Sequence, residues 1–246
     1  MESIAPEQLQ GLSLSVVIPA FNEEGGIRET IEEVRQALAC VPGPTEIIVV
    51  DDGSEDDTRG EAERAGVRIE VNPVNSGYGA ALKRGIRGAQ HEFVAILDAD
   101  RTYPARYLPG MLALAKEYDM VVGDRGSAMN NVPLVRRPAK KVLNWLASFL
   151  AQRKLNDINS GMRVFRRQEL LPFLPLLPSG FSFTTTITLC MACTDKALVY
   201  TPIEYRARVG RSKIRPVDFV NFIVLILRVI MLFNPLRIFL PAGLIF

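Results

Sequence analysis

The chain has 246 residues, of which 48% are hydrophobic, and a formal net charge of +2. This length and hydrophobic content suffice for one large α/β domain with a packed core, and the small net charge gives no support to a nucleic-acid-binding protein. The single histidine, His91, argues against a histidine-based catalytic triad and against a histidine-rich metal site. Cys190 and Cys193 form a CxxC pattern inside an apolar helix-like run, which is more typical of buried side chains than of a zinc or redox site.

Strand-like and helix-like segments alternate along the first 124 residues. Short β-branched or apolar runs predict strands over 14–20, 46–54, 67–72, 92–100 and 119–124. Helical spacing or small-residue runs predict helices over 25–39, 77–89 and 104–117, with one more helix after Ser54. Ser54 and Asp57 match the pattern of a capping box for that helix. The alternation predicts a layered α/β fold with a mainly parallel central sheet flanked by helices.

The second half of the chain is more basic and more amphipathic. A polar, proline-containing segment over 125–138 precedes an amphipathic segment over 139–155 that carries cations at both ends. This segment either packs on the domain as a helix or lies on a membrane surface. Its apolar positions are Val142, Leu143, Leu146, Phe149 and Leu150.

The end of the chain is apolar but interrupted by polar residues and proline. Arg228, Pro235 and Arg237 break the run within 216–246, so a complete membrane span is not expected inside it. We expect residues 217–233 to lie along a membrane surface as an amphipathic interfacial helix. Residues 241–246 would then begin a transmembrane segment that continues beyond residue 246.

Two aspartates stand at the end of the predicted strand 92–100, in the sequence "AILDADRTYP". Ligands of open α/β sheets bind outside the carboxyl ends of the strands, and an i, i+2 pair on an extended chain directs both side chains to one face. Asp98 and Asp100 would therefore converge, while Ala99 points away. Two converging carboxylates favour Mg²⁺ or Mn²⁺, which leaves coordination positions for a phosphate group. The alternative is a capped strand end with both carboxylates in solvent.

Several motifs together resemble family 2 glycosyltransferases of the GT-A fold. The segments "SVVIPAFNEE", "EIIVVDDGSEDDT", "NSGYGAALKRGI" and "VAILDADRTYP" occur in the family's order, whereas the turn after the first strand lacks a dinucleotide-binding GxGxxG and the chain has no P-loop. Later segments, "DINSGMRVFRR", "GFSFTTTITL" and "RVGRSKI", resemble the dolichol-phosphate mannose synthase branch, the polyprenyl-phosphate glycosyltransferases. The resemblance covers residues 13 to 240.

The resemblance implies an activity and a cellular location. The implied reaction is the inverting, metal-assisted transfer of a sugar from a UDP- or GDP-linked donor to dolichyl or undecaprenyl phosphate, with Mg²⁺ or Mn²⁺ as cofactor. The enzyme would work at the cytoplasmic face of a membrane, anchored by C-terminal transmembrane helices beyond residue 246. The implied organisation is an N-terminal tail over 1–12, a GT-A catalytic domain over 13–215, and a juxtamembrane segment over 216–246.

The resemblance also implies roles for individual residues. The nucleotide-binding set is Pro19, Ala20, Glu23, Asp51, Asp52 and Asp98. The metal set is Asp98 and Asp100, and the catalytic set adds Arg125 and Arg163. A basic loop over the diphosphate contributes Arg208, Gly210, Ser212 and Lys213, and the acceptor side is formed by Asp157, Ser160 and Gly161. Thr102 stands where many relatives carry glutamine, so this third metal ligand is open to question.

Two other functions remain open at this point. One is a GT-A enzyme that transfers to a glycan or glycolipid hydroxyl, which would need a general base, and Asp157 is the evident candidate between residues 125 and 200. The other is a catalytically weak, membrane-recruited subunit that only binds a nucleotide sugar. A homo-oligomer is compatible with either.

Overall fold

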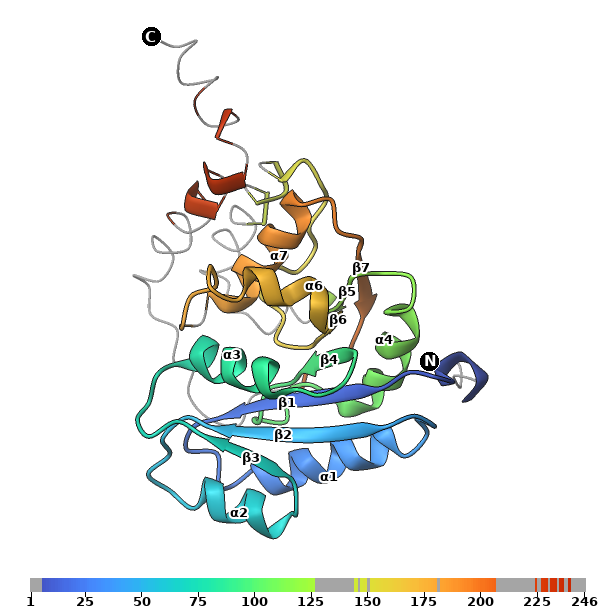
Figure 1. Cartoon of the computed structure of the whole chain (residues 1–246), viewed down its shortest axis with the longest axis vertical. Coiled ribbons are helices and arrows are strands. Elements are labelled where there is room, and N and C mark those ends of the chain that lie inside the picture. Colours follow the sequence, from blue (N-terminus) through green and yellow to red (C-terminus); the bar gives the residue numbers. More distant parts are fainter. Residues whose placement is uncertain are drawn as a thin grey trace.

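Seven strands form one central sheet, in the order β3-β2-β1-β4-β6-β5-β7 (Figure 1). The computed structural model describes residues 6–126, 144–180 and 182–206, apart from 146 and 150, together with separate residues between 224 and 239. The strands are β1 (Leu14–Ala20), β2 (Thr45–Asp51), β3 (Arg68–Val71), β4 (Phe93–Ile96), β5 (Met120–Asp124), β6 (Arg163–Arg166) and β7 (Leu198–Pro202).

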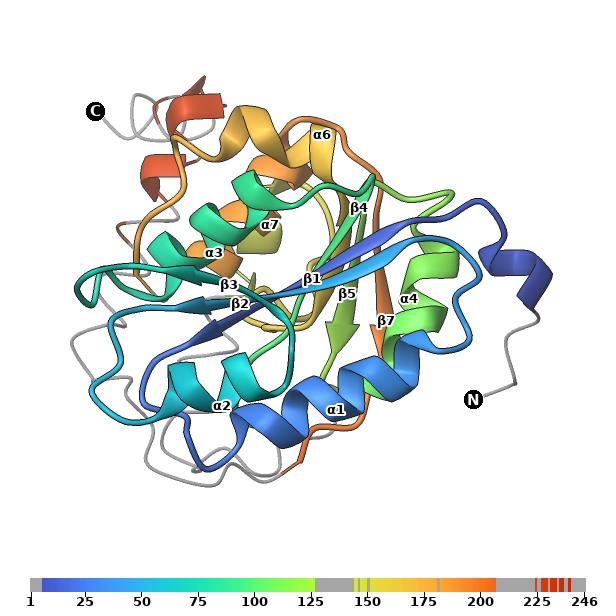
Figure 2. The same ribbon diagram turned by 60° about the horizontal axis from the view of Figure 1, so that its bottom comes forward.

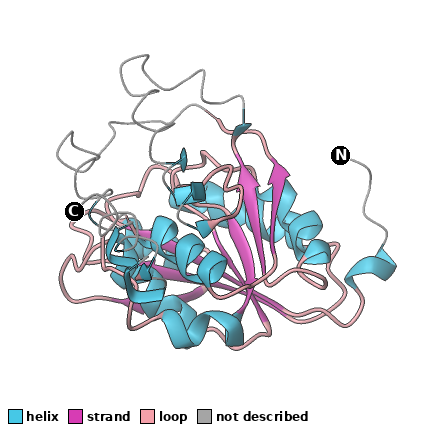
Figure 3. Ribbon diagram, turned by 90° about the horizontal axis from the view of Figure 1, so that it is seen from above, coloured by secondary structure: helices cyan, strands magenta, loops and turns pink. Residues whose placement is uncertain are grey.

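Helices cover both faces of the sheet, and Figure 3 shows the strands fanning out between them. The α-helices are α1 (Ile27–Leu38), α2 (Thr58–Arg64), α3 (Tyr78–Gly88), α4 (Leu108–Leu114), α6 (Arg167–Leu170) and α7 (Phe183–Cys193). Short 3-10 helices are η1 (Pro6–Leu9), η2 (Ala105–Tyr107) and η5 (Leu171–Phe173). In Figure 2, α1 and α2 lie on one face, and α3, α6 and α7 lie on the other.

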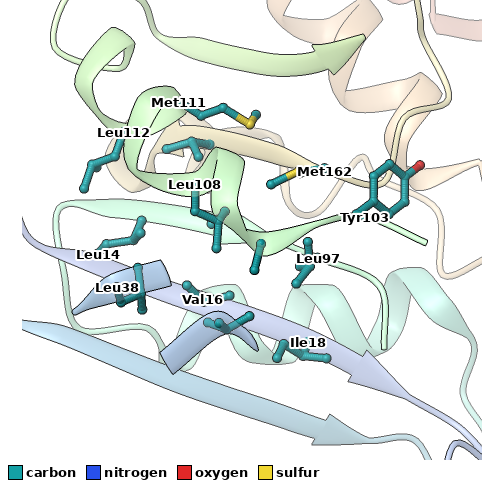
Figure 4. Packing of buried hydrophobic residues seen from close by; sticks show 14 of the residues in the cluster. Leu14, Val16, Ile18, Leu38, Leu97, Tyr103, Leu108, Met111, Leu112 and Met162 are labelled. Carbon is teal, nitrogen blue, oxygen red and sulfur yellow. The ribbon is translucent and has the colours of Figure 1, made fainter. Parts of the chain in front are cut away.

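The sheet separates two hydrophobic clusters because successive strand residues point to opposite faces. On β1, Val17 packs into the cluster beneath α3 and α7. Its neighbours Val16 and Ile18 pack into the other cluster with α1 and α4, as Figure 4 shows. A strand that is buried on both faces is expected to be mostly apolar, which explains the run at 14–20. Its one hydroxyl side chain, Ser15, donates to Glu46 Oε1 at 2.6 Å.

The predicted α/β fold with a mainly parallel sheet is confirmed, but the sequence did not reveal two of its strands. β6 inserts between β4 and β5 and runs antiparallel to both. β7 extends the sheet parallel to β5. Both strands are short and pair with partners far away in the chain, so no local pattern marks them.

The predicted strand over 92–100 is too long. β4 ends at Ile96, and the two aspartates lie in the turn that follows. Arg101, directly after them, has a φ of 62° in the left-handed region, which ends any extended conformation. Ala99 is buried in the core, as expected from its side chain pointing away from the aspartates.

The predicted capping box before α2 is wrong. The N-cap Asp57 makes no side-chain hydrogen bond to the start of the helix. Ser54 Oγ instead accepts the backbone N–H of Asn22, at 3.0 Å, from the loop after β1. Ser54 therefore joins two loops, and it is Asp56 Oδ1 that accepts the N–H of Thr58, the first residue of α2, at 3.0 Å.

The apolar run with the CxxC pattern forms α7, as predicted. Cys190 is a residue of α7 and its side chain is buried in the core. Burial raises the pKa of the Cys190 thiol to about 12. The thiol is therefore protonated near neutral pH and packs as a small apolar side chain.

The two ends of the chain are described only in part. Leu9 and Leu12 are buried in the core, so packed structure begins before the first strand. Among the described residues, no helix is long and apolar enough to cross a lipid bilayer. The predicted interfacial helix over 217–233 falls mostly outside the described residues, although Val229 packs in the core and Leu232 is exposed; 241–246 lies wholly outside them.

Candidate active site

The first group of predicted site residues meets where β1 and β2 end. Ala20 pairs with Asp51 in the parallel register, and Asp52 N–H donates to Ala20 O at 2.9 Å. Pro19 precedes Ala20 in β1, and Glu23 N–H donates to Thr58 Oγ1 at 2.8 Å. The carboxyl ends of two neighbouring parallel strands thus bring the predicted nucleotide side together.

Asp52 organises the loop before α3. Its carboxylate accepts hydrogen bonds from Asn72 Nδ2 at 2.7 Å, from Ser76 N–H at 3.0 Å and from Gly77 N–H at 2.7 Å. Asp51, next to it, accepts the N–H of Ser54 at 3.0 Å. A carboxylate has about four acceptor positions, so Asp52 retains limited capacity for a further donor such as a nucleotide base.

Asp98 lies on the α3 side of the sheet. Its Oδ1 accepts the hydroxyl of Tyr78, the first residue of α3, at 2.8 Å. Burial and the neighbouring Asp98 carboxylate raise the pKa of the Tyr78 hydroxyl well above its ordinary value, so it remains a donor. β4 thus fixes where the turn with Asp98 begins, and Tyr78 of α3 fixes the orientation of the Asp98 carboxylate.

Asp100 is held within its own turn. Its Oδ1 accepts both the Thr102 N–H, at 3.1 Å, and the Thr102 hydroxyl, at 2.6 Å. Thr102 is fully buried, so its hydroxyl is well placed to fix the carboxylate. Thr30 of α1 donates to Ala99 O at 2.8 Å and supports the turn from the opposite face. Thr102 therefore orients the Asp100 carboxylate, which is a different role from that of a third metal ligand.

The donor set fits a hard divalent cation. Asp98 and Asp100 supply carboxylate oxygens, the ligand type that Mg²⁺ and Mn²⁺ prefer, and each carboxylate is oriented by a hydroxyl donor. Within the described part of the chain, no group of three or more His, Cys, Asp or Glu side chains converges. A cation held here would therefore need additional oxygen ligands from phosphate or water.

Gly161 packs directly against Asp98. A Cβ atom on Gly161 would lie 2.5 Å from Asp98 Oδ2 and 2.9 Å from its Cγ. The Gly161 N–H donates to Tyr103 Oη at 2.7 Å, which holds the backbone in this position. The segment over 157–161 and the aspartate turn thus pack against each other, although they are far apart in the sequence.

This close contact makes Gly161→Ala a sharp test of the geometry. We expect the methyl group to displace the Asp98 carboxylate and to lower the rate of sugar transfer roughly tenfold or more, because small displacements at a reacting centre are costly. The rate should be compared with that of Gly25→Ala, since a Cβ on Gly25 meets nothing within 4 Å. Equal rates for the two variants would contradict the placement of Gly161.

Arg125 and Asp157 form a bidentate ion pair. Arg125 Nε donates to Asp157 Oδ2 at 2.7 Å, and Nη2 donates to Oδ1 at 2.8 Å. The side chains are 16% and 4% exposed, respectively. The guanidinium also lies over the ring of Tyr205, 5.3 Å from its centroid, and Tyr205 packs edge-on against Tyr103. Two residues predicted for different substrates therefore contact each other.

Arg163 is completely buried and holds the 157–161 segment from below. It donates to Ser160 O and Ile158 O, both at 2.9 Å, and to Thr188 Oγ1 at 2.6 Å. Burial lowers the pKa of its guanidinium. These contacts give Arg163 a supporting role beneath Ser160, whereas its predicted membership of the catalytic set remains a prediction.

The remaining predicted site residues are not described. Arg208, Gly210, Ser212 and Lys213 lie outside the described residues. The backbone that leads to them is anchored at the site, because Arg206 N–H donates to Thr102 O at 2.9 Å. Arg206 also forms a bidentate pair with Glu33 of α1, at 2.9 and 3.1 Å.

Sequence reasoning missed the aromatic residues of the site. Tyr78, Tyr103 and Tyr205 lie within or beside quoted motifs, yet only the fold brings their hydroxyls and rings to the aspartates and to Arg125. The local sequence offers one indication of such a role, because Tyr78 is a large residue with a hydroxyl at the start of a helix of small residues.

The sequence matches the Glycosyl transferase family 2 profile over residues 15–171. A dolichyl-phosphate hexose transferase from Haloferax volcanii is 34% identical over 205 residues, covering 82% of this chain and 87% of the relative. A dodecaprenyl-phosphate galacturonate synthase from Rhizobium johnstonii is 30% identical over 172 residues, covering 65% of this chain and 49% of that protein.

Solved structures with the same fold include glucosyl-3-phosphoglycerate synthase from Mycobacterium tuberculosis. Its complex with phosphoglyceric acid superposes with a TM-score of 0.71 at 25% identity, covering 93% of this chain and 85% of that one. Its complex with Mn²⁺, UDP and glucosyl-3-phosphoglycerate gives 0.70 at 24% identity and bears on the fold alone. The matched profile, the seven-stranded sheet and these likenesses establish that the chain belongs to glycosyltransferase family 2 and is a glycosyltransferase with the GT-A fold.

Proposed function

We propose that this glycosyltransferase moves a sugar from a nucleoside-diphosphate sugar to the phosphate of a polyprenyl lipid, with the aid of a divalent metal. Support comes first from the relatives whose names state a dolichyl-phosphate or dodecaprenyl-phosphate substrate. The Haloferax relative is 34% identical over most of both chains, and this similarity supports the same class of acceptor for the two proteins.

The observation that carries the choice of acceptor is the pairing of Asp157. Transfer to a hydroxyl needs a general base, and Asp157 is the candidate for that role between residues 125 and 200. Both of its carboxylate oxygens accept hydrogen bonds from Arg125. A carboxylate tied in this way is a poor proton acceptor, because the guanidinium stabilises its charged form. A lipid phosphate is already anionic and needs no base.

The position of His91 agrees with this choice. Its backbone N–H donates to Ser15 Oγ near the start of β1. His91 precedes β4, whereas the aspartates follow it, so the only histidine lies at the opposite end of the sheet from the site.

The chain's own residues would then have distinct tasks. Asp98 and Asp100 would hold the cation, which supplies charge stabilisation for the departing diphosphate. Asp52 and the strand ends would bind the base and ribose. Arg125, held by Asp157, would present a fixed positive charge on the acceptor side. The basic residues of 208–213 would offset the repulsion between the lipid phosphate and the diphosphate of the donor. In-line attack by the lipid phosphate would invert the anomeric carbon.

A nucleotide-release assay with different acceptors tests the proposal. We expect polyprenyl phosphate to stimulate nucleotide release from a UDP- or GDP-linked hexose, while neutral glycans do not. Stimulation by 3-phosphoglycerate alone would instead indicate an acceptor like that of glucosyl-3-phosphoglycerate synthase, and would contradict the proposal. Release that no acceptor stimulates would favour the subunit that only binds a nucleotide sugar.

We further propose that a pair of exposed aromatic residues contacts the membrane. Trp145 and Phe149 are 64% and 62% exposed, and their rings stack with centroids 5.6 Å apart. Ala147 and Ala151, on the same helical segment, are buried in the core. Large aromatic side chains point outward while small ones point inward, which is the reverse of a soluble helix and is typical of an interfacial one.

Trp145 is the only tryptophan, so its fluorescence reports directly on this contact. We expect a blue shift of its emission when vesicles containing an anionic phospholipid are added, because the indole leaves water. Phe149→Ser should weaken vesicle binding several-fold, whereas Val74→Ser, at another exposed apolar residue, should not. An unshifted spectrum in the presence of bound vesicles would place the membrane contact elsewhere.

A further inference from the structure

The residue that links the base side of the site to the metal side is Tyr78. Its backbone is held from both directions at the start of α3. The preceding Gly77 N–H donates to Asp52 Oδ2 at 2.7 Å, and the following Gly79 N–H donates to Ser179 O, also at 2.7 Å. Tyr78 therefore has little freedom to move along or around the helix axis.

The close packing at Gly77 strengthens this restraint. Gly77 has a φ of 98°, which side chains other than glycine rarely adopt. A Cβ atom there would also lie 2.6 Å from Ser179 O. The helix start thus lies directly against the segment over 178–180, and it could not retreat without breaking these contacts.

From this fixed backbone the side chain reaches Asp98. The ring packs against the hydrophobic cluster beneath α3, and the hydroxyl donates to Asp98 Oδ1 at 2.8 Å. On the other side of the same carboxylate, Gly161 approaches Oδ2 closely. The rotation of the Asp98 carboxylate is consequently limited by a donor on one oxygen and by backbone on the other.

We propose that Tyr78 is a positioning residue, which orients Asp98 for the divalent cation and couples that orientation to the base-side carboxylate Asp52. The proposal rests on the proposed function only in taking Asp98 and Asp100 as the metal carboxylates. Partners that orient a ligating carboxylate commonly change metal affinity by about 10- to 100-fold when removed. The phenol hydroxyl has this effect through Asp98 and makes no contact with the cation itself.

The test uses the full chain and the variant Tyr78→Phe, which removes the hydroxyl and keeps the ring. Mn²⁺ affinity is measured by the electron paramagnetic resonance signal of free Mn²⁺, at saturating UDP or GDP, whichever binds the parent chain. We expect the dissociation constant for Mn²⁺ to rise roughly tenfold. Nucleotide affinity without metal should stay unchanged. Tyr107→Phe is the matched control, because its hydroxyl accepts the N–H of Glu204 instead of contacting an aspartate.

A double-variant cycle separates positioning from a general loss of stability. If Tyr78 acts through Asp98, adding Tyr78→Phe to Asp98→Asn should leave Mn²⁺ affinity as it is in Asp98→Asn alone. An additional loss in the double variant would overturn the proposal. So would an equal loss of nucleotide affinity with and without metal, since that result would place the hydroxyl on the nucleotide.

The outcome also distinguishes this proposal from the metal assignment. Unchanged Mn²⁺ affinity in Asp100→Asn would remove the proposed metal site itself. Weakened affinity in Asp100→Asn together with normal affinity in Tyr78→Phe would leave the metal site standing and refute the positioning role alone.

Discussion

Replacing Asp100 by asparagine should reduce sugar transfer by at least about 100-fold at saturating nucleotide sugar. The substitution removes one negative charge at nearly constant shape, and a bound metal contributes several kcal/mol to stabilising charge in the transition state. Each 1.36 kcal/mol corresponds to a factor of ten in rate. The asparagine Oδ1 can still accept the hydroxyl of Thr102, so the turn should keep its structure.

The initial rate and the melting temperature together check this expectation. The melting temperature of Asp100→Asn should match that of the parent chain, and Asp195→Asn, an exposed aspartate on a turn, should change neither quantity. A normal rate for Asp100→Asn at saturating Mg²⁺ would mean that Asp100 does not hold the cation.

The second large effect is expected on stability, at the pair of Arg125 and Asp157. Asp157→Ala leaves a guanidinium that is only 16% exposed without its bidentate partner. Removing one member of a buried ion pair typically costs about 3–5 kcal/mol, because the remaining charge stays desolvated. Urea denaturation should therefore show a clearly lower midpoint for Asp157→Ala than for the parent chain.

The matched comparison replaces both members of the pair. Arg125→Met combined with Asp157→Leu should recover most of the lost stability, because apolar groups of similar volume need no partner, yet it should remain poor in sugar transfer. Glu63→Ala, which breaks the exposed pair with Arg59, should leave the midpoint almost unchanged. If the double replacement is as unstable as Asp157→Ala, the ion pair is not the source of the loss.

The parts of the fold that local sequence predicts are the ones with strong local signals. Most of β1 and the centre of β2 are apolar, and α1 buries one clear stripe, so the sequence predicts all three to within a few residues. β6 is a short segment whose partners, β4 and β5, lie far away in the chain, and only the tertiary structure determines its pairing. The apolar run before Asp98 was extended too far, because the positive φ at Arg101 leaves no pattern in the sequence.

The sequence predicts which residue types lie at the site, but not which side chains pair with one another. The carboxylates at the ends of β2 and β4 follow from the rule that ligands bind at strand ends. The pairing of Arg125 with Asp157 depends on how the 157–161 segment folds back onto β5, which spacing alone does not reveal. Likewise, Asp52 holds the loop before α3 through three donors that come from residues 72–77.

Identification of the product tests the central claim most directly. The chain is incubated with Mn²⁺, a panel of radiolabelled UDP- and GDP-hexoses, and vesicles containing dolichyl or undecaprenyl phosphate, and the label extracted into organic solvent is counted. We predict that one donor yields extractable label that requires both the lipid phosphate and the metal, and that Asp100→Asn lowers it by at least about 100-fold. Label that appears only on a soluble acceptor, or extractable label that forms without the lipid phosphate, would contradict the account.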